Sequence, residues 1–162
     1  MERMPWVGGS GHATASSLIG DDTAGYLSWG FVRHPVERMV STHYGRRRNM
    51  REPEWLSCAD TFDEFVRAVY EPQNRRRMFH TVPMRDYLCD SNGNVVVDFV
   101  GRYERISDDW RAIERLVGVP HSKLYALNRS RHRRWEDECK GKVLDMVIEL
   151  FDDDFKIFGY KV

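Results

Sequence analysis

Short apolar runs alternate with stretches of helical periodicity along this chain. The apolar and aromatic run at 27–33 predicts a buried strand, and the run at 95–100 predicts a second core strand. Pro35 follows the first run and suits the first turn of a helix, where its missing N–H costs nothing. We therefore expect a strand, a tight turn and then a helix from Pro35 to about Arg48.

A second helix is expected after Thr61, which can act as its N-cap. Glu64 completes a capping box, and Pro72 ends the helix. The helical period places four apolar residues on one face. These residues are Phe62, Phe65, Val66 and Val69.

Two more helices are expected in the second half of the chain. One is capped by Ser107, Asp108 and Asp109 and runs to about Val117. It would turn Trp110, Ile113 and Leu116 inward. The other is a long helix at 136–151, with its apolar face made by Val143, Met146, Val147 and Leu150.

The segments between these elements read as loops. Residues 1–25 are rich in Gly, Ser, Ala and Thr, with room for a short helix at 13–19, and the charged stretch 46–54 reads as a solvated loop. The sequence Asp-Ser-Asn-Gly at 90–93 is a strong turn signal between two β-like runs. Strands that alternate with helices predict an α/β layered fold with a mostly parallel sheet. A length of 162 residues predicts a single domain over 1–162.

Composition excludes some classes of function and location. The 25 basic residues balance the 25 acidic ones, so no overall field attracts nucleic acid or a membrane surface. No apolar run reaches membrane-spanning length, and the N-terminus lacks the apolar stretch of a signal peptide. Cys58, Cys89 and Cys139 form no metal-ligand pair and no clear disulfide framework, which favours a reducing, cytoplasmic compartment.

The candidate chemistry is concentrated in the strand, turn and helix at 29–44. Arg33 ends the strand, Arg38 follows five residues later, and Ser41 follows eight residues after Arg33. A guanidinium group, a hydroxyl and the free N–H groups of a helix N-terminus together can hold a dianion such as a phosphate. The plain alternative is a surface arginine with a helix hydroxyl that bonds its own backbone.

The segment at 33–41 resembles the pattern Arg-[Asn/Asp]-Pro-x-[Asp/Glu]-Arg-x-x-Ser, the 3'-phosphate motif of sulfotransferases. The resemblance is to sulfotransferase family 2, which contains the Golgi-type and bacterial glycan enzymes. Five other segments agree with this family in order and spacing. They are 11–15, 87–93, 97–104, 127–130 and 154–160.

This resemblance implies a three-layer fold like that of P-loop NTPases, with a mostly parallel central sheet. It implies the donor 3'-phosphoadenosine-5'-phosphosulfate (PAPS), a glycan or other hydroxyl acceptor, and no metal. Arg33 and Ser41 would bind the 3'-phosphate of the donor, and Arg38 is a further candidate for this role. Asn128 and Ser130 resemble a late loop that contacts the donor.

His12 is the candidate general base. A histidine has an intrinsic pKa near ~6.5 and can accept a proton near neutrality. The resemblance places a histidine of this kind before the phosphate-binding strand, and His80 and His43 are alternatives. His34 stands where the motif usually has Asn or Asp, and histidine still tolerates such a turn.

The chain departs from the family in one respect. A lysine-containing loop for the 5'-phosphosulfate should precede His12 by some tens of residues, yet the first of only five lysines is Lys123. The chain would then be N-terminally truncated, leaving 1–25 as a remnant, or it would be a degenerate paralogue. Either way we expect weak or no transfer, because each lost charge-stabilising donor costs about 10²–10³ in rate. A lost N-terminal anchor would place a eukaryotic form at the Golgi membrane.

Two other functions compete with sulfuryl transfer. A non-catalytic module could hold PAP, another nucleotide or a sulfated glycan through Arg33 and Ser41. An arginine-rich nucleic-acid binder is disfavoured by the zero net charge and by the lack of a stacking motif. The basic runs 46–48, 75–77 and 129–134 could draw an anionic glycan or could simply be solvated.

Overall fold

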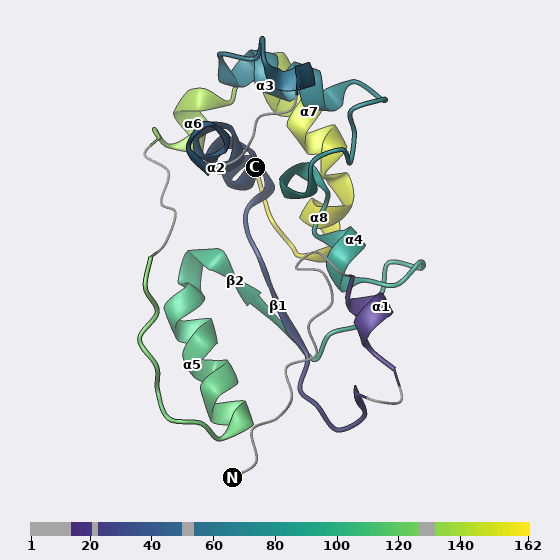
Figure 1. Cartoon of the computed structure of the whole chain (residues 1–162), viewed down its shortest axis with the longest axis vertical. Helices are drawn as coiled ribbons and strands as arrows, with labels where there is room; N and C mark the ends of the chain where they lie inside the picture. The colour runs from purple at the N-terminus through teal and green to yellow at the C-terminus, as the bar shows by residue number, and fades with distance from the viewer. Residues whose placement is uncertain (1–13, 21–22, 50–53, 127–131) are drawn as a thin grey trace.

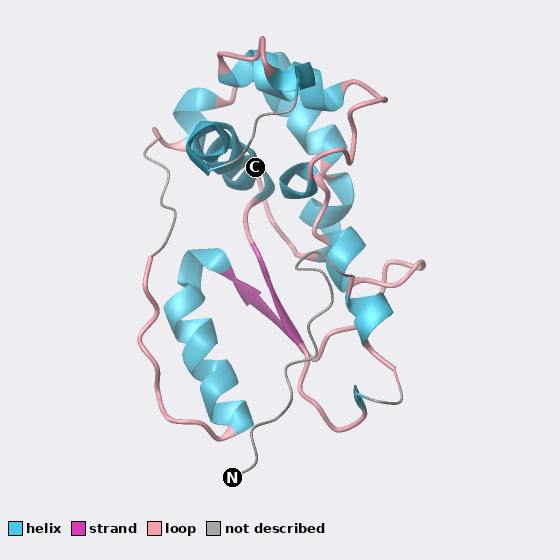
Figure 2. Cartoon of the chain, viewed as in Figure 1, coloured by secondary structure: helices cyan, strands magenta, loops and turns pink. Residues whose placement is uncertain are grey.

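The computed structural model describes residues 14–20, 23–49, 54–126 and 132–162. Two parallel strands, β1 (Trp29–Val32) and β2 (Phe99–Arg102), lie between helix α5 (Ile106–Val117) and the other helices (Figures 1 and 2). Trp29 pairs with Phe99 and Val32 pairs with Arg102. The predicted α/β class with parallel pairing is confirmed, and the described residues contain one sheet, of these two strands.

Most of the helices gather at one end of the molecule (Figure 1). They are α2 (Pro35–Asn49), α3 (Phe62–Tyr70), α6 (Trp135–Glu138), α7 (Gly141–Leu150) and α8 (Asp152–Ile157). The short helices α1 (Ala15–Leu18) and α4 (Arg85–Leu88) lie beside each other at the flank of the molecule.

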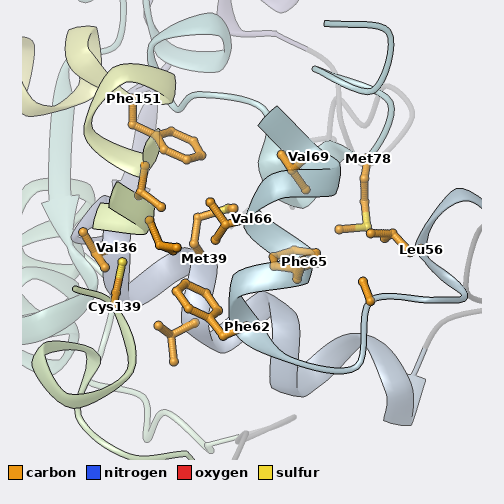
Figure 3. Packing of buried hydrophobic residues seen from close by; sticks show 14 of the residues in the cluster. Val36, Met39, Leu56, Phe62, Phe65, Val66, Val69, Met78, Cys139 and Phe151 are labelled. Carbon is orange, nitrogen blue, oxygen red and sulfur yellow. The ribbon is translucent and has the colours of Figure 1, made fainter. Parts of the chain in front are cut away.

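The main core forms where α2, α3 and α7 meet. The four apolar residues predicted on the α3 face are all buried there, against Val36 and Met39 of α2 (Figure 3). The capping box of Thr61 and Glu64 is present, and Glu71 caps the end of the helix just before Pro72. Helix α3 therefore begins, faces inward and ends as the sequence predicts. A smaller cluster of Val32, Leu88, Cys89 and Phe158 joins β1 to α4 and α8.

The second strand begins later than predicted. Val95 forms an isolated antiparallel bridge with Cys89 across the 90–93 turn, so the first part of the apolar run serves this hairpin. The Asp98 carboxylate then accepts hydrogen bonds from the Ser28 N–H at 2.8 Å and from the Ser28 hydroxyl at 2.7 Å. Only after this contact does β2 pair with β1.

The predicted long helix at 136–151 is broken. Lys140 is extended, and Gly141 has a φ of 55°, which glycine adopts without strain. The break separates α6 from α7 and leaves Cys139 buried in the main core. A side chain that fills the core at this point outweighs the continuous helical pattern, as tertiary packing often outweighs local preference.

Two expectations about charge and burial are also wrong. The helix α2 continues to Asn49, and Arg46 is buried rather than solvated, with its guanidinium donating to the carbonyl groups of Leu56 and Ala59. On α5, Leu116 is 62% exposed instead of inward. The described part of the sheet has only two strands for α5 to pack against, so part of the apolar surface of α5 remains exposed to solvent.

Helix α5 anchors the chain that follows it through Glu114. This carboxylate is bonded to Nδ1 of His121 at 2.7 Å and accepts the Ser122 N–H at 2.6 Å. Burial acts to raise the pKa of Glu114, but these hydrogen bonds outweigh it and bring the pKa from 4.5 to about 2. The contact fixes the start of the segment that leads to 127–131.

The core role of α3 predicts a large loss of stability for Phe65→Ala. Truncating a buried phenylalanine should lower the free energy of unfolding by about 3–5 kcal/mol, measured by urea denaturation. Arg67→Ala, on the exposed face of the same helix, is the control and should change it by about 0.5 kcal/mol or less. Equal losses for the two variants would contradict this packing.

The lowered pKa of Glu114 predicts a dependence of stability on acid. Its carboxylate stabilises the fold above pH 4.5, and this contribution is lost as the pH falls from 4.5 towards about 2. Glu114→Gln should therefore flatten the fall in unfolding free energy between pH 5 and pH 3. The exposed Glu71→Gln is the control, and an unchanged slope in Glu114→Gln would refute the prediction.

Candidate functional site

The candidate site lies at the edge of the sheet where both parallel strands end. β1 leads into Arg33, His34 and Pro35, and the Arg38 N–H donates to the His34 carbonyl at 2.9 Å as α2 begins. The N–H groups of Val36 and Glu37 precede this first intrahelical bond. Such N–H groups at the start of a 15-residue helix favour an anion.

Arg33 is held in place from two sides. Its Nη2 donates to Glu37 Oε1 at 3.0 Å, and its Cζ lies 4.6 Å from the centroid of the Tyr103 ring. The side chain is 20% exposed, while its Nε is buried and has no hydrogen-bond partner among the described residues. A buried N–H without a partner is costly, and an anion bound to Arg33 would supply one.

Ser41 lies on the same face of α2 as Glu37, because residues four apart are neighbours on a helix surface. Glu37 in turn holds Arg33. Arg33 thus lies beside the first turn of the helix face that carries Ser41.

Arg38 points in another direction. Its Nη2 donates to the Val82 carbonyl at 2.7 Å and to the Phe79 carbonyl at 3.4 Å, and its Cζ lies 5.9 Å from the centroid of the Phe151 ring. Burial lowers the pKa of Arg38, and the nearby Asp154 carboxylate opposes this effect. Arg38 thus fastens the segment 79–82 to α2.

Asp154 fastens the next part of the same segment. Its two carboxylate oxygens accept the N–H groups of Met84 and Arg85, both at 2.8 Å. Burial raises the pKa of Asp154, while these two backbone donors act in the opposite direction. Arg38 and Asp154 together hold residues 79–85 against α2 and α8.

The structure describes only some of the other predicted site residues. His12, Asn128 and Ser130 lie outside the described residues. His43 is buried and packs edge-to-face against Tyr44 and Phe62, which agrees with a packing role.

Sequence reasoning missed the part that the turn after β2 plays at this site. Tyr103 and Glu104 begin a 3₁₀ turn, Tyr103–Arg105, directly after β2. The Glu104 carboxylate accepts the His34 N–H at 2.6 Å. The signal was present, because residues that follow two paired parallel strands meet at the same edge of the sheet.

A shallow pocket lies apart from this turn, between α1, α4 and the 90–93 turn. Its two arginines are both paired with carboxylates, Arg76 with Asp86 and Arg85 with Asp153. It is lined by Thr14, Ser16, Arg76, Arg85, Asp86, Cys89, Asp90 and Ser91. The paired charges leave the pocket close to neutral.

Comparison with known proteins identifies the family of the chain. The model of the sulfotransferase family matches residues 10–161, nearly the whole chain. The chain belongs to the sulfotransferase family. The resemblance drawn from the six sequence segments is thereby confirmed, and family membership implies a sulfuryl donor as co-substrate.

Curated relatives of this sulfotransferase-family chain include carbohydrate sulfotransferase 14 of Homo sapiens, 26% identical over 161 residues, which cover 83% of the chain and 42% of the relative. Carbohydrate sulfotransferase 11 of Rattus norvegicus is 26% identical over 172 residues, covering 85% of the chain and 47% of the relative. An uncharacterized protein of Archaeoglobus fulgidus is 30% identical over 106 residues, covering 64% of the chain and 78% of that protein.

The chain spans less than half the length of the two carbohydrate sulfotransferases. No solved structure matches it significantly. Within the described residues, every helix is too short or too polar to traverse a bilayer. The same residues contain no group of His, Cys, Asp or Glu that could hold a metal ion.

The different surroundings of the two arginines predict different effects on stability. Arg38→Met leaves the Phe79 and Val82 carbonyls without their donor and should lower the free energy of unfolding by about 1–3 kcal/mol. Arg33→Met removes a partly exposed i,i+4 ion pair and should cost less than about 1 kcal/mol. Urea denaturation measures both, and an equal or larger loss for Arg33→Met would contradict this assignment.

Proposed function

We propose that the chain forms the donor-binding part of a carbohydrate sulfotransferase. It binds PAPS through the 3'-phosphate, and the sulfuryl group passes to a hydroxyl of a glycan. The observation that carries this proposal is the fixed guanidinium of Arg33 beside the N-terminus of α2, with an Nε that finds no hydrogen-bond partner in the described parts of the chain. The names of the relatives, carbohydrate sulfotransferases 11 and 14, support a carbohydrate acceptor.

Arg33 would hold the 3'-phosphate with charge-assisted hydrogen bonds, which are about twice as strong as neutral ones. Its contact with Glu37 uses Nη2, so the other nitrogen atoms of the fork remain for the phosphate. Ser41 would add a hydroxyl from the next turn of the helix. Arg38 would support the site by fastening the segment 79–82 to α2. Its Nη1, which has no hydrogen-bond partner among the described residues, would be a further donor. Asn128 and Ser130 are proposed to contact the donor.

In the reaction, the acceptor oxygen attacks sulfur as the bond from sulfur to the phosphate oxygen breaks. The products are the sulfate ester and PAP, and the acceptor proton passes to a base, for which we propose His12. The role of the described residues is to fix the donor, because positioning supplies much of the catalysis of such transfers.

A second candidate uses the same site without transfer. A binding module would hold PAP or a sulfated glycan through Arg33 and Ser41. Such binding would need only the Arg33 guanidinium and the first N–H groups of α2, which lie together at the turn after β1. Binding of PAP without transfer of the sulfuryl group from PAPS to a panel of carbohydrate acceptors would favour this module.

Titration calorimetry with PAP tests the donor site. The wild-type chain should bind PAP with micromolar affinity, and Arg33→Ala should bind about 100-fold more weakly because two charge-assisted hydrogen bonds are lost. Ser41→Ala should lose about threefold to tenfold, as one neutral hydrogen bond is removed.

Arg111→Ala is the matched control for the change in charge. Arg111 lies on α5 and is paired loosely with Asp108 at 3.7 Å, away from the turn at 33–35. Its removal should leave the PAP affinity unchanged within about twofold. Equal affinity of Arg33→Ala and wild type for PAP would overturn the proposed site.

A further inference from the structure

Two consecutive residues after β2 hold two consecutive residues after β1. Tyr103 supports the side chain of Arg33 through its ring, and Glu104 accepts the backbone N–H of His34 at 2.6 Å. This N–H lies just before the helix, so an orphan donor of the turn is satisfied by a carboxylate. The register that pairs Val32 with Arg102 brings these residues together.

Glu104 is itself held by the C-terminal segment. The Tyr160 hydroxyl donates to Glu104 Oε2 at 3.1 Å. Burial raises the pKa of the Tyr160 phenol, and the neighbouring Glu104 charge adds to this effect, so the hydroxyl keeps the proton that it donates. Arg102 secures Tyr160 in turn, with its Cζ 4.6 Å from the ring centroid and its Nη2 donating to the Phe158 carbonyl.

The His34 ring makes a second link to the same segment. Its Nε2 lies 2.9 Å from the Lys161 carbonyl, which can only accept, so Nε2 carries the proton. The ring stacks on Trp135 at a centroid distance of 5.0 Å and meets Phe155 and Tyr160 edge-on. The usual Asn or Asp of this motif has no ring to fill such a site. The imidazole therefore ties the turn to α6, α8 and the chain end.

We propose that Glu104 is a positioning residue for Arg33. It fixes the backbone of the 33–35 turn, and with Tyr160 and the His34 ring it makes residues 158–161 part of the donor-binding unit. This inference rests on the proposed function, since it concerns the binding of the 3'-phosphate by Arg33. Glu104 acts through the turn, and its effect is on donor affinity.

Asp98 is a matched comparison within the same strand pair. Both carboxylates lie on the β2 side and accept a backbone N–H from the β1 side, Asp98 from Ser28 before the strands and Glu104 from His34 after them. The two contacts therefore close opposite ends of the pairing, and only Glu104 adjoins Arg33. Loss of either should weaken the sheet, whereas only loss of Glu104 should loosen the turn.

Amide hydrogen exchange of the ligand-free protein, followed by NMR, tests the positioning. In Glu104→Ala the amides of Arg33 and His34 should exchange about tenfold faster or more, because a charge-assisted hydrogen bond is lost. In Asp98→Ala these two amides should exchange as in wild type. Unchanged exchange in Glu104→Ala, or equal acceleration in Asp98→Ala, would overturn the inference.

PAP affinity, measured by calorimetry on the same variants, tests the consequence. Glu104→Ala should weaken PAP binding about tenfold and Tyr160→Phe about threefold, while Asp98→Ala stays within twofold of wild type. Glu104→Gln keeps an oxygen for the His34 N–H and should recover most of the affinity. It also serves as the test if Glu104→Ala fails to fold, with a weakening of about threefold expected relative to wild type.

The outcomes separate the two proposals. If Glu104→Ala binds PAP as tightly as the wild-type chain does, the positioning role alone is overturned. Glu104 would then contribute only to stability. Failure of the wild-type chain to bind PAP would overturn the proposed function and, with it, the donor role of Glu104.

Discussion

The parallel pairing of β1 with β2 is the contact on which the candidate site depends. It joins segments 70 residues apart in the sequence and places the residues that follow both strands at one edge of the sheet. Close packing allows little variation here. A Cβ on Gly30 would lie 2.4 Å from Leu88 Cδ2, and one on Gly101 would lie 2.4 Å from Phe31 Cε1. Small residues at both positions let side chains cover the strands directly, and this packing sets where Arg33 leaves the sheet.

The arginines illustrate how one residue type serves different purposes in this chain. Arg46 and Arg38 use their planar donor groups to hold backbone carbonyls of loops, in buried or partly buried settings. Arg33 contacts a carboxylate and an aromatic face instead, and its Nε has no hydrogen-bond partner among the residues that the structure describes. Composition alone could not separate these roles, because the number of arginines says nothing about which carbonyls lack donors.

Local signals predicted the local structure well. The capping box at Thr61, the proline that starts α2 and the turn at 90–93 are encoded by residues close to each other in sequence. The errors arose where distant contacts decide. Cys139 enters the core and breaks a helix, and Asp98 delays a strand by bonding Ser28. At the site, the motif indicated Arg33 and Ser41 as candidate residues, whereas the contacts of Tyr103 and Glu104 with the turn at 33–35 depend on a strand pairing that no local pattern encodes.

A crystal structure of the chain with PAP tests the central claim most directly. The account predicts that the 3'-phosphate lies within hydrogen-bonding distance of Arg33 and the first N–H groups of α2, with Glu104 still bonded to the His34 N–H. A phosphate bound instead at the pocket between α1 and α4, beside Arg76 and Arg85, would contradict the account.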